Sequence, residues 1–103
     1  MYSLQLTSEF ECWLDGLKDK KSQVRIAARL RQIESGNLGD WKTVSDRISE
    51  LRVHSGQGYR LYFTRKENVL IIVLAGGPKS SQTRDIVRAR NILLQLETEH
   101  GEK

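Results

Sequence analysis

The sequence predicts a small α+β domain with its elements in the order β-α-α-β-β-β-α. Three apolar runs between residues 48 and 75 are separated by two turn signals, which indicates an antiparallel meander. Apolar residues recur at helical intervals before this meander and again after it. The 103 residues suffice for one domain, expected over residues 1–97 with a flexible tail at 98–103. We therefore expect a small antiparallel sheet with two N-terminal helices and a C-terminal helix.

The N-terminal segment predicts a short strand and then a helix. Residues 2–6 alternate between apolar and polar, and Ser8 and Glu11 have the spacing of a capping box. The apolar stripe of this first helix consists of Phe10, Trp13, Leu14 and Leu17. Because Trp13 shares this spacing, we interpret it as a core aromatic and not as a platform for stacking on a base.

A second helix is expected over residues 21–35, ended by Gly36 and Asn37. Its apolar side consists of Val24, Ile26, Ala27, Leu30 and Ile33. Lys21, Arg25 and Arg29 are spaced by four and share one helical face. This basic face is either a ridge that contacts phosphates or a solvated surface. Residues 37–47 read as a loop in which Gly39 is a pivot.

The meander consists of strands at residues 48–54, 59–65 and 69–75, with turns at 55–58 and 66–68. The first two strands alternate, and the third is continuously apolar, which is typical of a strand covered on both faces. The apolar side chains of the first two strands share one face: Leu51, Val53, Leu61 and Phe63.

We call this assignment of side chains to faces the parity of the hairpin. It predicts a polar cluster on the opposite face, formed by Arg52, His54, Arg60 and Tyr62. In the expected register His54 lies opposite Arg60, and Arg52 lies opposite Tyr62. The turn then needs one extra residue, and Gly56 or Gly58 can adopt the positive φ that a bulge requires. Two guanidiniums, an imidazole and a phenol would form an anion-binding surface with a titratable group. The alternative is an ordinary solvated outer face.

The segment after the meander, residues 76–81 (GGPKSS), opens the last helix, capped by Ser80 or Ser81. The packing stripe of this helix is Ile86, Ala89, Leu93 and Leu96. A lysine beside a helix N-terminus is a plausible anion site. It is not a nucleotide-binding P-loop, because the GxxxxGK[ST] spacing is absent.

Composition sets modest bounds on function. Seventeen Lys and Arg against thirteen Asp and Glu give a net charge of +4, which favours an anionic partner. The single cysteine, Cys12, cannot form an internal disulfide. No apolar run is long enough to span a membrane, and the N-terminus lacks a signal-peptide pattern. We expect a protein of the reducing cytoplasm.

Three motifs in order, SELR, GxGYRLYF and GGxKSSQxRDI, give the chain a family resemblance over residues 3–97. It resembles the addiction-module killer proteins of the RelE/HigB-like toxin superfamily. The resemblance implies the RelE-like form of the fold described above. It also implies a bacterial type II toxin, kept inactive by a cognate antitoxin encoded in the adjacent frame as a helix-turn-helix protein.

The resemblance further implies a ribosome-dependent endoribonuclease that cuts mRNA with no metal or other cofactor. In that reaction the 2′-hydroxyl of the mRNA attacks the adjacent phosphate and expels the 5′-oxygen of the next nucleotide. The protein then has to orient the backbone, stabilise the phosphorane and move protons. The resemblance implies Arg60, Arg52 and Lys79 as catalytic residues, and we assign His54 as the general acid or base because its imidazole can donate and accept a proton. The RNA-binding residues are Tyr62, Gln82, Arg84, Arg25 and Arg29.

A second function is open, because ParE-like toxins of the same superfamily inhibit DNA gyrase and cut no RNA. The last helix departs from some ribosome-dependent relatives, since its run DIVRARNILLQLE holds neither the Tyr nor the His that they carry there. The basic residues of the strands and Lys79 favour the nuclease. A plain RNA-binding module is disfavoured, because exposed aromatics of the kind that bind single strands are lacking.

Overall fold

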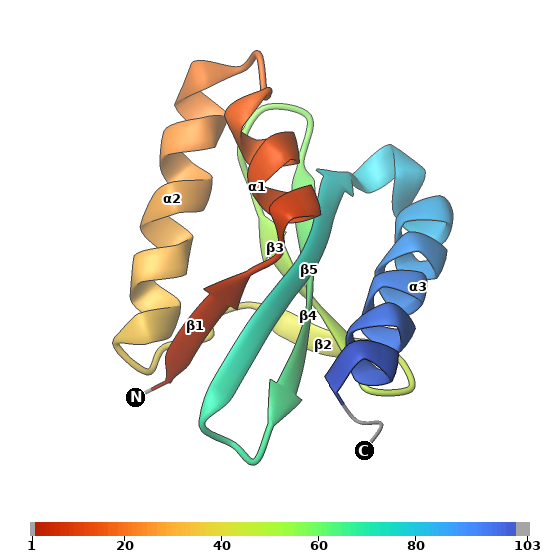
Figure 1. Cartoon of the computed structure of the whole chain (residues 1–103). Coiled ribbons are helices and arrows are strands. Elements are labelled where there is room, and N and C mark those ends of the chain that lie inside the picture. The colour runs from red at the N-terminus through yellow and green to blue at the C-terminus, as the bar shows by residue number, and fades with distance from the viewer. Residues whose placement is uncertain (1, 101–103) are drawn as a thin grey trace.

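The computed structural model describes residues 2–100 and confirms the α+β class (Figure 1). The elements are β1 (Ser3–Leu6), α1 (Ser8–Asp15), α2 (Lys20–Glu34), β2 (Trp41–Ser45), β3 (Ile48–Val53), β4 (Tyr59–Lys66), β5 (Leu70–Pro78), the 3-10 turn η1 (Lys79–Ser81) and α3 (Gln82–His100). Helix α3 continues past residue 97, so residues 98–100 of the expected tail are helical, and 101–103 lie outside the described residues. Among residues 2–100 no helix has the length and apolar character to cross a membrane.

The five strands form a single sheet in the order β1-β5-β4-β3-β2. The expectation of an all-antiparallel sheet was wrong, because β1 pairs with β5 in parallel, with Leu4 opposite Ile71. The other three pairings are antiparallel. Alternation along a strand indicates which side chains share a face, but not the neighbour or direction of that strand. The sheet is therefore mixed.

The expected loop at residues 37–47 contains an additional strand, β2, which pairs with β3 at the sheet edge. Its side chains at residues 41–43 are exposed, and the pairing is irregular between Thr43 and Ser45. A short edge strand with only two apolar residues, Trp41 and Val44, has no apolar alternation that would reveal it in a sequence. Strand β2 forms because its backbone pairs with the edge of β3 that β4 leaves open.

Helices cover both faces of the sheet and create two apolar clusters. Helices α1 and α2 pack on one face through Phe10, Ile26 and Ile33, and all four apolar meander residues lie there as predicted. Helix α3 packs on the other face through Ala89, Ile92 and Leu93. Strand β5 is thus covered on both sides, as its continuous apolar run indicated. Val24 was expected among the buried residues of α2, but it is 65% exposed.

The β3–β4 hairpin has the predicted parity but a different register. Arg60 lies opposite Arg52, not opposite His54, and Tyr62 lies opposite Glu50. The strands therefore separate after Val53, and His54 falls into a five-residue turn at 54–58. Both turn glycines have positive φ, 56° at Gly56 and 88° at Gly58, which confirms the expected conformation. Parity cannot distinguish registers that differ by two residues, because both keep every side chain on its face.

Candidate functional site

The polar face of the hairpin holds an arginine pair tied to one buried carboxylate. Glu50 Oε2 accepts a hydrogen bond from Arg60 Nη1 at 2.9 Å and one from Arg52 Nε at 3.2 Å. Glu50 Oε1 accepts a third from Gln82 Nε2 at 2.8 Å, which joins the first residue of α3 to the sheet. We call these four residues, Glu50, Arg52, Arg60 and Gln82, the arginine cluster.

Charge compensation explains why this arrangement is stable. Two guanidiniums directly opposite each other on adjacent strands repel, and a carboxylate between them removes that repulsion. Glu50 has no exposed surface, and a buried carboxylate needs charged or hydrogen-bonding partners to remain ionised. The side chains of Arg52 and Arg60 remain 31% and 18% exposed. The cluster therefore keeps its anion enclosed and its two cations at the surface.

Tyr62 lies under α3, where the sequence had suggested an exposed residue. Its side chain is fully buried in the apolar cluster formed with α3, so the expectation that it binds RNA was wrong. Burial, aided by the negative charges of Asp85 and Glu50, raises the pKa of the phenol. Among the described residues its hydroxyl has no hydrogen-bond partner. The sequence showed the correct face, but not that a helix would cover this part of it.

Lys79 directly follows β5, whose Gly77 lies opposite Arg60. Its backbone N–H donates to Gly58 O at 3.1 Å and so ties η1 to the β3–β4 turn. Its aliphatic stem passes over Gly58, where a Cβ atom would come within 3.2 Å of Lys79 Cδ. The charged end is exposed, as is Arg84 one turn later. A shallow polar groove of about 360 Å³ runs along residues 79–84.

The start of α3 is built differently from the expected serine cap. A 3-10 turn precedes the helix, and the Ser81 hydroxyl donates to Asp85 Oδ2 at 2.5 Å. Asp85 is buried, lies over Gly77 and forms an ion pair with Arg88. Asp85 therefore anchors the first turn of α3.

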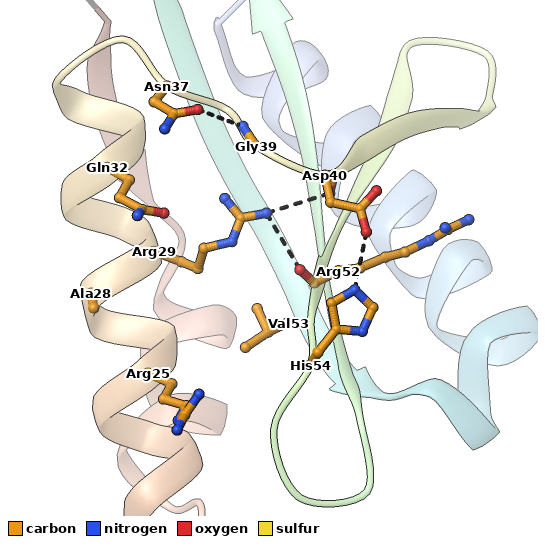
Figure 2. Close-up of a pocket in the computed structure, with 10 residues that line it drawn as sticks. All are labelled: Arg25, Ala28, Arg29, Gln32, Asn37, Gly39, Asp40, Arg52, Val53 and His54. Atoms are coloured by element: carbon orange, nitrogen blue, oxygen red, sulfur yellow. Dashed lines mark hydrogen bonds and ion pairs between the residues drawn. The ribbon is translucent and has the colours of Figure 1, made fainter.

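His54 lies at the entrance of a second groove of about 470 Å³ between α2 and the end of β3 (Figure 2). Its Nε2 atom lies 3.1 Å from Asp40 Oδ2, and its side chain is 77% exposed. This contact lowers the pKa of Asp40. Figure 2 shows the Arg52 side chain pointing away from α2, so Arg52 lines this groove mainly with its backbone.

The two basic residues of α2 that were expected to bind RNA differ in their surroundings. The guanidinium of Arg29 donates to the backbone carbonyl oxygens of Leu38, Asp40 and Arg52, and so fastens the segment before β2 to α2. Partial burial lowers the pKa of Arg29. Arg25 is exposed at the groove rim. Of the two, Arg25 is the residue placed to meet a ligand.

Sequence reasoning missed Glu50 as a member of the site. Glu50 shares the face of Arg52 and Arg60, a fact that alternation alone shows. Its importance follows from its burial, which depends on α3 and on Gln82 in particular. Within residues 2–100 no three His, Cys, Asp or Glu side chains gather in a way that could hold a metal ion.

The fold and the cluster together define a small α+β protein with a preformed cationic site at one end of its sheet. Residues 12–93 match the family model described as "Phage derived protein Gp49-like (DUF891)", and the chain belongs to this family. The family is associated with toxin–antitoxin systems and is related to RelE-type toxins. An uncharacterized protein of Haemophilus influenzae is 42% identical over 93 residues, which cover 90% of this chain and 94% of that protein.

Proposed function

We propose that this protein is the toxin of a type II toxin–antitoxin pair and cuts mRNA on the ribosome as a metal-independent endoribonuclease of the RelE/HigB-like type. The family association supports the toxin role. The observation that carries the nuclease proposal is the opposed pair Arg52 and Arg60, both held by Glu50.

The proposed chemistry needs a site for a phosphate that gains negative charge. The 2′-hydroxyl oxygen forms a bond to phosphorus and loses its proton, the bond to the 5′-oxygen breaks, and that oxygen takes up a proton. The products are a 2′,3′-cyclic phosphate and a free 5′-hydroxyl. Preorganised guanidiniums stabilise the phosphorane because they need little reorientation as its charge develops.

Roles follow from exposure and position. Arg60 and Arg52 contact the scissile phosphate, and the exposed Lys79 and Arg84 bind flanking phosphates. Arg25, exposed at the rim of the groove of Figure 2, is a further proposed contact to RNA. His54 is the proposed proton carrier because an imidazole can both donate and accept a proton, and because it follows Arg52 by two residues. His54→Ala should then lower the rate by about 10²-fold and change the pH profile of cleavage.

The test is induction of the protein in growing bacteria, with mapping of mRNA ends and measurement of plasmid supercoiling. Cuts confined to translated frames would support the proposal. Intact mRNA together with DNA damage would instead identify a ParE-like gyrase inhibitor. A matched culture that expresses Arg31→Ala, an exposed charge loss on α2, controls for net charge.

A further inference from the structure

We infer that Glu50 is a positioning residue, which holds the guanidiniums of Arg52 and Arg60 in the orientation that receives a phosphate. This inference rests on the proposed function, because the phosphate is that of the RNA substrate. Its starting point is that one fully buried carboxylate contacts both candidate phosphate-binding arginines.

Glu50 is not placed to take a proton from RNA itself. A general base must come within about 2.6–3.2 Å of the group that it deprotonates. The Glu50 side chain has no exposed surface, and both of its oxygens accept hydrogen bonds from protein donors. Glu50 therefore acts on the reaction only through the arginines.

Each arginine retains donors for a substrate. A guanidinium has five N–H donors in a rigid plane. In the described part of the chain, Arg60 directs Nη1 at Glu50 and Arg52 directs Nε at it, and no other side-chain hydrogen bond is formed by either. Because a planar group fixed at one nitrogen has few orientations left, the remaining donors are aimed before the phosphate arrives.

Gln82 adds a second level of control. Its amide donates to the other oxygen of Glu50, so the first turn of α3 fixes the rotation of the carboxylate. The two arginines come from β3 and β4, and the tie comes from α3. The orientation of the arginine pair thus depends on how α3 is seated against the sheet.

Glu50→Gln tests the inference because it keeps the shape and removes the charge. The net charge of the cluster becomes more positive, so we expect the affinity for mRNA-programmed ribosomes to be unchanged or higher. The single-turnover cleavage rate should fall by roughly tenfold to a hundredfold, because the guanidiniums lose their fixed orientation. Glu34→Gln, at the exposed end of α2, is the matched control and should cleave as the parent does.

Gln82→Leu serves if Glu50→Gln does not fold, since Gln82 is only half-buried. Gln82→Leu leaves the charges of Glu50, Arg52 and Arg60 in place. We expect a smaller loss of cleavage rate than for Glu50→Gln, at unchanged affinity for programmed ribosomes. Gln95→Leu, exposed on α3, is its control. The positioning role would be overturned if affinity and cleavage rate fell together, in proportion to the unfolded fraction. It would also be overturned if both variants cleaved at the parental rate.

NMR of the arginine side chains gives a readout that does not depend on cleavage. In the parent protein, rotation of the Arg52 and Arg60 guanidiniums should be slow, and Glu50→Gln should make it fast. Parent protein that cuts no RNA would refute the proposed function and leave this measurement standing. Parent protein that cuts RNA with guanidiniums equally mobile in both forms would refute the inference alone.

Discussion

The side chains in and around the arginine cluster are of two kinds, those that reach solvent and those that are enclosed. Lys79 is exposed, and Arg52 and Arg60 are partly so, whereas Glu50 and Tyr62 are completely buried. An exposed cation is available to a phosphate, and an enclosed group can only influence one through its neighbours. The effects of single substitutions should divide in the same way.

Arg60→Ala should abolish growth arrest. The loss of one preorganised charged donor to a developing oxyanion costs on the order of 3–4 kcal/mol, or 10²–10³ in rate. Arg60→Lys should restore only part of the rate, since an ammonium keeps the charge but not the planar fork. The measurement is cleavage on programmed ribosomes, with circular dichroism to establish folding. Parental cleavage by folded Arg60→Ala would place the site elsewhere.

Tyr62→Phe should leave cleavage unchanged, because the ring is buried under α3. The phenolic hydroxyl has no partner among the described residues, and a buried hydroxyl without one costs free energy. The free energy of unfolding should therefore stay constant or rise by about 1 kcal/mol. Urea unfolding measures this value. A stable variant with slow cleavage would give the hydroxyl a part in the reaction.

At the scale of elements, the junction of β5 with α3 decides whether the arginine cluster forms. Asp85 packs directly over Gly77, and Gln82 reaches Glu50 from the turn just before Asp85. A side chain at Gly77 would push the start of α3 away from the sheet. Gly77 is thus required by close approach, since its φ is not positive.

Gly77→Ala should destabilise the protein, because the new methyl group would overlap the buried Asp85 carboxylate. Overpacking of this kind costs roughly 1–3 kcal/mol or more. Gly16→Ala, whose Cβ atom would come no nearer than 3.4 Å to Cys12 O, is the control and should change stability by less than about 0.5 kcal/mol. Equal urea midpoints for the two variants would contradict this packing.

The elements that the sequence predicts well are those whose pattern is local. Apolar periodicity predicts the three helices and the strands β3, β4 and β5. The turn between two strands predicts the positive φ of Gly56 and Gly58. Strand β2, the parallel partner of β5 and the two-residue shift in register all depend on contacts between segments distant in the sequence. For the same reason Arg52 and Arg60 were predicted on one face of the sheet, but their direct pairing and the burial of Glu50 and Tyr62 were not.

At the scale of the whole molecule, exposed cationic side chains lie on both α2 and η1. Arg25, Lys21 and Lys79 are exposed, and the net charge of the chain is +4. Such a surface is complementary to an acidic segment of a partner as well as to RNA. In the proposed toxin role that partner is the antitoxin.

The protein should therefore co-purify with an antitoxin when it is expressed from its native operon. Binding should weaken as salt is raised, since charge pairs at an exposed surface are screened. Affinity capture followed by mass spectrometry identifies the bound chain, and Lys21→Ala with Arg25→Ala should reduce its yield. Recovery of free, toxic protein alone would count against an antitoxin that covers this surface.

The stability of the whole fold should fall in acid. The pKa of Asp19, which caps α2, is lowered mainly by its side-chain hydrogen bond with Ser22, and the pKa of Asp40 mainly by its contact with His54. A carboxyl whose folded pKa is below its unfolded pKa stabilises the fold above the unfolded value, near 3.8 here, and loses this contribution as pH falls through the folded value.

Urea midpoints at about pH 6 and about pH 3 measure this acid loss. Asp19→Asn should show a smaller decrease between the two pH values than the parent does, because its cap no longer titrates. Asp15→Asn, an exposed change at the end of α1, is the control. Identical slopes for the parent and Asp19→Asn would remove Asp19 from the acid response.

The parallel pairing of β1 with β5 has a consequence for synthesis. The hydrogen bond from Thr7 to Leu74 joins residues that are 67 positions apart, so the first strand to be made has no partner until most of the chain exists. At about 5–20 residues per second, that interval lasts roughly 3–13 s. The arginine cluster is completed later still, because Gln82 is synthesised after β5. An unfinished chain therefore carries Arg52 and Arg60 before Gln82 is present to hold Glu50 between them.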